Sequence, residues 1–142
     1  MADRNLQVPG RLDQVQRICE FVGQAAASAG LDRRATYACQ LAVTEACENI
    51  IKHGYAGQAG TITATTRSQP GELAIELEDT APPFKPAQGP TELSWTQQNP
   101  PIGGLGLLII HRVMDEVTYE RRGNKNWLRM VKRSSGLRRA SP

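Results

Sequence analysis

The sequence is poor in the residues that cross-link small proteins or bury them in membranes. It has only three cysteines, with no Cys-x-x-Cys pair and no histidine cluster beside them. This number and spacing argue against a disulfide framework or a zinc site and favour a reducing compartment. The longest apolar run, at residues 105–110, is far shorter than the ~20 residues that cross a bilayer, and no apolar signal segment begins the chain. We therefore expect a cytoplasmic protein with no membrane partner.

Neither sign of charge is in large excess, since 17 Lys and Arg stand against 14 Asp and Glu and leave a net charge of +3. Much of the excess lies near the C-terminus, in Lys132, Arg133, Arg138 and Arg139. Basic runs of this kind are usually solvated ends. No recognition motif for nucleic acid accompanies this one, so we expect no nucleic-acid partner.

Length and hydrophobic patterning predict one domain with its own core. The chain has 142 residues, 39% of them hydrophobic, which suits a single domain at residues 1–133 followed by a basic tail at 134–142. Helical periodicity predicts helices at 12–29, 33–53 and 104–114, with Asp32 as the N-cap of the second helix and Gly54 as its stop. β-Branched or alternating residues predict strands at 5–8, 61–67, 73–78, 117–121 and 127–132.

The order of these elements predicts the fold class. Helices separated from a mostly antiparallel sheet describe an α+β two-layer sandwich with the helices on one face. A doubly wound nucleotide-binding sheet would need regular alternation of strand and helix, which is missing. Residues 80–103 carry six prolines and no sustained period, so we expect a long loop of the kind that is functional.

The second helix carries the first candidate site. Glu45, Glu48, Asn49 and Lys52 fall within an arc of roughly 100° at helical spacing. One interpretation is a solvent-facing polar stripe. The other uses Glu45 and Asn49, which are i and i+4 and therefore project to one place. An asparagine oxygen can help to ligate a hard cation, and a glutamate can accept a proton, as phosphoryl transfer requires.

Two later features could bind a nucleotide. Asp79 stands at a strand exit, where it could accept a hydrogen bond from an adenine amino group, or simply form an Asp-Thr turn. Phe84 fits a core position. Gly103-Gly-Leu-Gly106 opens a helix, where glycines permit close backbone approach and free N–H groups favour a polyphosphate. That signal is weak alone, and the Lys-Ser/Thr of a P-loop is absent.

Together, Glu-x-x-x-Asn on a helix, Asp at a strand end and Gly-x-Gly opening a helix resemble the GHKL ATPase/kinase superfamily and its Bergerat fold. Residues 44–55 and 114–117 are similar to the anti-sigma-factor serine kinases within it. The resemblance covers roughly residues 6–133. It implies a homodimer that uses ATP and Mg²⁺, binds a sigma factor and phosphorylates a serine of an anti-anti-sigma partner of the STAS type.

The resemblance also assigns roles to residues. Asn49 would bind the Mg²⁺ that bridges the ATP phosphates, Glu45 would act as general base or orienter for the serine hydroxyl, and Asp79 would contact the adenine amino group. Residues 88–103 would form a lid. The expected nucleotide contacts are Asn49, Asp79, Ala81, Phe84, Gly103, Gly104, Leu105, Gly106, Leu107 and Asn126.

The chain departs from the superfamily pattern in two places. Ala81, Pro82 and Pro83 stand where glycines are usual, which restricts the backbone if a positive φ is needed there. Asn126 stands near the place of the usual Gly-Thr. Three functions remain open: an active anti-sigma-factor kinase, a regulatory binding module with weak or no catalysis, and an ATPase domain of another signalling system. A histidine-kinase catalytic domain fits less well, because nothing resembles a phosphoacceptor helix pair.

Overall fold

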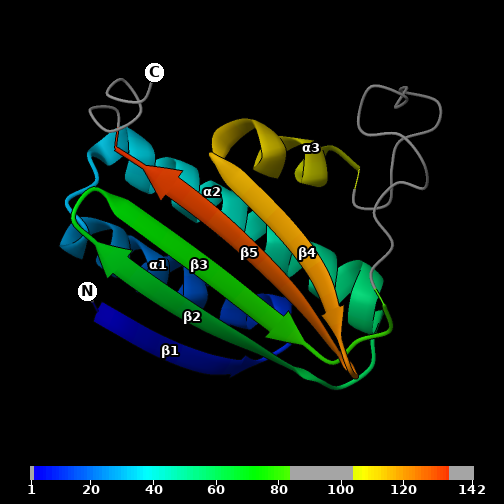
Figure 1. The fold of residues 1–142 in the computed structure, drawn as a ribbon. Coiled ribbons are helices and arrows are strands. Elements are labelled where there is room, and N and C mark those ends of the chain that lie inside the picture. Colours follow the sequence, from blue (N-terminus) through cyan, green and yellow to red (C-terminus); the bar gives the residue numbers. More distant parts are fainter. Residues whose placement is uncertain (1, 84–103, 135–142) are drawn as a thin grey trace.

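The described residues of this computed structural model, 2–83 and 104–134, form a five-stranded sheet with helices against one face (Figure 1). The strands are β1 (Ala2–Pro9), β2 (Thr61–Gln69), β3 (Glu72–Asp79), β4 (Glu116–Arg122) and β5 (Lys125–Arg133). Their order across the sheet is β1-β2-β3-β5-β4, and each neighbouring pair is antiparallel. The predicted α+β two-layer architecture is confirmed.

Three helices cover the sheet in the described ranges. They are α1 (Val15–Ser28), α2 (Arg33–Asn49) and α3 (Gly104–Val113), and α2 packs between the other two (Figure 1). Asp32 is the N-cap of α2, as predicted, because its Oδ1 accepts a hydrogen bond of 2.8 Å from the backbone N–H of Ala35. None of the helices among the described residues is long and apolar enough to cross a membrane.

Two helix boundaries differ from the sequence prediction. Leu12 lies in a 3-10 turn (Leu12–Gln14) before α1 and is 52% exposed, so it is no part of the core. Gly54 does not stop the second helix, because α2 continues as a π-helical turn, Ile50–Tyr55. The helix ends at Ala56, which adopts the left-handed φ of 49° that more often belongs to glycine.

The core lies between the helices and the sheet. Its largest fully buried side chains include Ile18 of α1, Ile75 and Leu77 of β3, and Ile110 of α3. α2 contributes small side chains instead, among them Cys39 and Cys47. Burial raises the pKa of each of these two thiols to about 12. Both therefore remain protonated at neutral pH and pack as small apolar groups.

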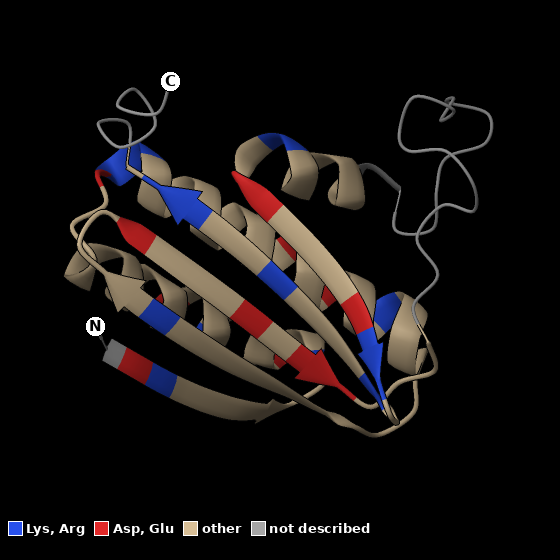
Figure 2. Cartoon of the chain, in the orientation of Figure 1, with Lys and Arg blue, Asp and Glu red and all other residues tan. Residues whose placement is uncertain are grey.

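The other face of the sheet is charged, with acidic and basic residues side by side on neighbouring strands (Figure 2). Arg67 of β2 pairs with Glu76 of β3, and the Arg122 guanidinium lies 3.7 Å from the centroid of the Trp127 ring. Exposed pairs of this kind contribute little stability singly. The packing that stabilises the sheet is therefore mainly on the face that the helices cover.

Tyr55 fixes the end of the second helix against the sheet. Its ring is buried, and its hydroxyl donates to the backbone oxygen of Thr61 and accepts from the backbone N–H of Thr80. The ring lies so close to Gly60 that a Cβ there would be 2.1 Å from a ring carbon. Position 60 therefore has no room for a side chain.

The packing of Tyr55 predicts that Gly60→Ala lowers the free energy of unfolding by about 2–3 kcal/mol, as overpacking of a core does. Gly30→Ala is the control, since φ at Gly30 is +80° but nothing lies within 4 Å of its Cβ position, and we expect a loss of only about 1 kcal/mol from backbone strain. Urea denaturation of both variants measures the difference. An equal or smaller loss for Gly60→Ala would contradict the placement of the Tyr55 ring.

Candidate functional site

A narrow, mostly apolar cavity lies between the C-terminal half of α2, the helix α3 and the ends of the central strands. Its lining residues are Ala46, Asn49, Ile50, Gly54, Asp79, Pro82, Leu107, Ile110, Tyr119, Asn126 and Leu128. Four of the predicted nucleotide contacts, Asn49, Asp79, Leu107 and Asn126, are therefore brought together. The cavity measures about 50 Å³, well below the ~300–1,000 Å³ of most ligand pockets.

Asp79, the last residue of β3, is the buried acid of this site. It pairs in register with Asn126, and only 6% of its surface is exposed. Its Oδ1 accepts hydrogen bonds from Asn126 Nδ2 at 2.8 Å and from the backbone N–H of Ala81 at 2.9 Å. Its Oδ2 accepts none from the described ranges, so one carboxylate oxygen stays available to a ligand in the cavity.

Asn126 is held in one orientation by two donors. Tyr119 Oη and Arg121 Nη1 both donate to Asn126 Oδ1, the second at 3.2 Å. Its amide nitrogen must therefore face Asp79 and the backbone oxygens of Ala81 and Pro82, to which it also donates. Sequence reasoning identified Asn126 but missed Tyr119 and Arg121, whose only signal was polar residues alternating along a predicted strand.

The charge state of Asp79 follows from opposing effects. Burial raises the pKa of this carboxyl above its ordinary value. Hydrogen bonds from Asn126 and the N–H of Ala81 act in the opposite direction, and so does the positive charge of Arg121. The hydrogen bond from Asn126 thus favours the ionised form of Asp79. An ionised carboxylate can only accept hydrogen bonds, so a ligand's amino group is a suitable donor to it.

Glu45 and Asn49 project from successive turns of α2, as predicted. Both side chains are half-buried. Gly106 of α3 lies directly over Glu45, because a Cβ at Gly106 would be 2.6 Å from Glu45 Oε1. A residue larger than glycine there would therefore require the flexible end of the Glu45 side chain to move.

Ala81 replaces a glycine of the superfamily pattern without backbone strain. Among the described residues the only non-glycine with positive φ is Ala56, so Ala81 needs no glycine-like conformation. It is 2% exposed, and its methyl group is the nearest neighbour of Gly54, where a Cβ would lie 3.1 Å away. The absence of a side chain at Gly54 thus creates the space for the methyl group of Ala81.

The remaining predicted contacts are described only in part. Gly104 is the first residue of α3, and Gly106 is buried in its first turn. Phe84, Gly103 and the expected lid at 88–103 lie outside the described residues, as does the side chain of Leu105. No cluster of three or more His, Cys, Asp or Glu suited to a metal occurs in the described ranges.

The arrangement has three chemically different parts. The open oxygen of Asp79 stands beside apolar walls, which suits a flat ring with an amino group. Asn49 offers an amide oxygen, and the first-turn N–H groups of α3 have no acceptor within the helix, as at the helix ends that bind phosphate. Glu45, one turn before Asn49, has a carboxylate that can accept a proton. Together they fit a nucleotide triphosphate and a group that attacks it.

Comparison with known families and proteins agrees with this chemistry. The family model of the histidine kinase-like ATPase domain matches residues 8–132. The serine-protein kinase RsbW of Listeria innocua serovar 6a is 30% identical over 118 residues, which are 79% of this chain and 75% of that protein. RsbW of Bacillus mycoides is 31% identical over 83 residues, 55% of this chain and 52% of that protein.

A solved structure shares the fold. The structure of the RsbU and RsbW domains of Rv1364c from Mycobacterium tuberculosis matches with a TM-score of 0.66 at 14% sequence identity. The match covers 94% of this chain and 32% of that longer chain. By the family match and the RsbW relatives, the chain belongs to the histidine kinase-like ATPase family and, within it, to the anti-sigma-factor serine kinases.

Proposed function

We propose that this protein is an ATP- and Mg²⁺-dependent anti-sigma-factor kinase, which binds a sigma factor and phosphorylates a serine on an anti-anti-sigma partner with a STAS domain. The observation that carries the proposal is the grouping around one cavity of a buried acid with an open oxygen, Asp79, and the α2 residue Asn49, with Glu45 one turn away. Membership of the family supports phosphoryl transfer as the class of reaction, and Asp79, Asn49 and Glu45 are the residues that we propose take part in it.

The residues present fit ATP with Mg²⁺. Asp79 Oδ2, open toward apolar walls, suits the adenine amino group, and the missing Cβ of Gly106 leaves α3 close to Glu45. Asn49 would ligate the metal through its amide oxygen. When bound, Mg²⁺ neutralises charge on the phosphate oxygens. Within the described ranges, Asn49 is the side chain of this site best suited to the metal.

The proposed reaction transfers the γ-phosphoryl group of ATP to a serine hydroxyl of the partner. A bond forms between the serine oxygen and γ-phosphorus, and the bond from γ-phosphorus to the β,γ-bridging oxygen breaks, which leaves ADP. Glu45 accepts the hydroxyl proton or orients the hydroxyl for attack. Such transfer depends mainly on positioning, and the Glu45 carboxylate lies beside Gly106 at the start of α3.

The proposal includes the wider setting of the kinase. We propose a cytoplasmic homodimer in which residues 1–133 form the ATP-binding domain and 134–142 a basic tail, with no nucleic-acid or membrane partner. Sedimentation equilibrium of the purified protein tests the dimer. A monomer at micromolar concentration would contradict it.

One observation favours a second function, a regulatory module of the same fold that holds its partner without catalysis. The cavity of about 50 Å³ in the described ranges is smaller than most ligand pockets. Calorimetric titration with ATP, with and without Mg²⁺, separates the two functions. Magnesium-dependent binding supports the kinase, and no binding supports the module.

Replacing Asn49 tests the metal ligand. Asn49→Ala removes the amide oxygen, so we expect phosphoryl transfer to fall at least about a hundredfold, measured with radiolabelled ATP and a STAS-domain substrate. The circular-dichroism melting curve should remain close to that of the wild type, since alanine favours helix. Full activity in the folded variant would exclude Asn49 as a ligand.

Replacing Glu45 separates chemistry from binding. Glu45→Gln keeps the size of the side chain but cannot accept the proton, so we expect transfer to fall by about 10²–10⁴-fold while the dissociation constant for ATP stays unchanged. Glu48→Gln, also half-buried on α2, is the matched control and should retain activity. Loss of ATP binding in Glu45→Gln would show that its role is structural.

Replacing Asp79 tests adenine recognition. Asp79→Asn can still accept from Asn126 but loses the charge that burial disfavours, so we expect unchanged or slightly higher thermal stability. ATP affinity should fall at least about tenfold, because a hydrogen bond to a charged group is lost. Calorimetry with ATP and GTP is the measurement. Equal affinity of the wild type for both nucleotides would refute the role of Asp79.

A further inference from the structure

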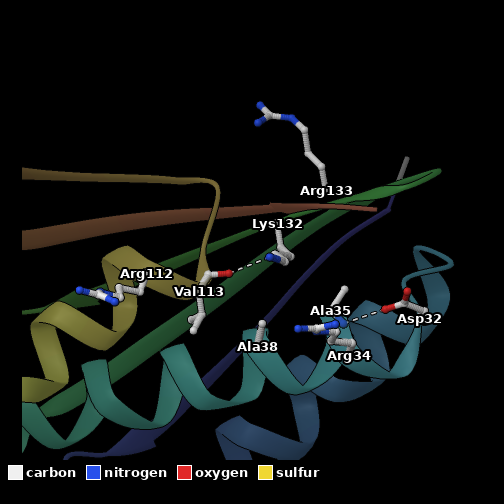
Figure 3. A pocket seen from close by; sticks show the side chains of 8 residues that line it. All are labelled: Asp32, Arg34, Ala35, Ala38, Arg112, Val113, Lys132 and Arg133. Atoms are coloured by element: carbon white, nitrogen blue, oxygen red, sulfur yellow. Dashed lines mark hydrogen bonds between the residues drawn. The ribbon is translucent and has the colours of Figure 1, made fainter. Parts of the chain in front are cut away.

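A second cavity lies at the opposite end of α2, between the start of that helix, the end of α3 and the end of β5 (Figure 3). It measures about 350 Å³, within the size range of ligand pockets. Its lining residues are Asp32, Arg34, Ala35, Ala38, Arg112, Val113, Lys132 and Arg133. Arg34 precedes Asn49 by about four helical turns, so the two cavities are roughly 20 Å apart along α2.

The lining is strongly basic, and its cations come from three elements. Arg34 belongs to α2, Arg112 to α3, and Lys132 and Arg133 to β5. The only acid in the lining is Asp32, whose Oδ1 is already the N-cap acceptor of α2. Positive charge therefore exceeds negative charge around the opening, and the N-terminal end of α2 adds to it.

The four cations differ in how far the protein already uses them. Lys132 Nζ donates to the backbone oxygen of Val113 at 2.7 Å, which leaves its other N–H groups available. Arg133 pairs with Glu72 and Glu116, and its guanidinium points away from α2 (Figure 3). It therefore contributes little to the pocket.

Arg34 and Arg112 are the unpaired cations. Both are exposed, and neither has a hydrogen bond or an ion pair with any residue in the described ranges. The nearest other acid along the chain, Asp115, accepts a hydrogen bond from the backbone N–H of Arg133 at 2.7 Å. These two arginines of the lining thus have their fork-shaped donors unused, and such groups bind carboxylate or phosphate oxygens well.

An exposed aromatic residue lies beside this rim. Tyr37 is 64% exposed and follows Arg34 by three positions on α2, so the two side chains are neighbours on the helix surface. Tyrosine and arginine are the residues that most often anchor protein partners. A free phosphate would use the arginines alone, whereas a protein segment can also cover the tyrosine.

We propose that this basic pocket, Arg34, Arg112 and Lys132 with Tyr37 at its edge, docks an acidic segment of a partner protein. Carboxylates of the segment pair with the two arginines and with Lys132, and an apolar side chain of the same segment covers Tyr37. The surface is separate from the ATP site, so docking there is compatible with a bound nucleotide.

The test uses a fluorescein-labelled decapeptide of alternating glutamate and leucine, with anisotropy measured in saturating ATP and Mg²⁺. We expect saturable binding with a dissociation constant below about 1 mM. Binding should weaken as the salt concentration rises, because salt screens the attraction between the acidic peptide and the basic pocket. Arg34→Glu and Arg112→Gln should each weaken it at least about tenfold. A glutamate at Arg34 lies in the first turn of α2, where the helix dipole favours it, so the fold should persist.

Lys125→Glu is the matched control, because it makes the same charge change at an exposed position outside the pocket. The affinity of the Lys125→Glu variant for the peptide should remain within about twofold of the wild type, since one exposed charge far from the pocket contributes little to binding there. An equal loss in Lys125→Glu, or no saturable binding in the presence of saturating ATP and Mg²⁺, would each overturn the proposal. Equally tight binding of inorganic pyrophosphate would overturn it too, since the pocket would then be a small-anion site.

Discussion

The hydrogen bond between Asn126 and Asp79 is the interaction on which the arrangement of the site depends. A carboxylate buried at the end of the central strand must be hydrogen-bonded, since an unpaired buried charge costs several kcal/mol. Asn126 provides that bond from the neighbouring strand and also binds the backbone oxygens of Ala81 and Pro82. One amide group therefore joins β3, β5 and the chain that leaves β3, and it uses only one of the two oxygens of Asp79.

Much of this fold could be predicted because its signals are local. Helical periodicity identified α1 and α2, and β-branched residues identified β2, since each pattern reflects which side chains face one core. The N-cap Asp32 was also recognisable, because the acceptor and its donor lie three residues apart. Asn49 could be chosen as the i+4 neighbour of Glu45 and Asp79 as the residue at a strand exit, whereas Asn126 was chosen from the family resemblance, near the place of the usual Gly-Thr.

The features that escaped prediction depend on contacts distant in sequence. Arg121 donates to the backbone oxygen of Ala81, 40 positions earlier, and no local pattern indicates such a bond. The π-helical turn at Ile50–Tyr55 was missed because Gly54 resembles a helix stop, whereas packing of Tyr55 keeps the chain helical past it. The basic pocket brings together three segments, and nothing in the local sequence around Arg34 or Arg112 indicates that they line one cavity.

The contact between Gly54 and Ala81 links two positions that lie 27 residues apart in the sequence. The gap between the π-helical turn and the chain leaving β3 accommodates one methyl group, which belongs to Ala81. A methyl group on both sides would bring two carbons to 3.1 Å, tighter than ordinary van der Waals contact. The two positions therefore share a single volume. An alanine at position 54 would therefore require the π-helical turn and the chain leaving β3 to shift apart by a few tenths of an ångström, beside the cavity that Gly54 lines.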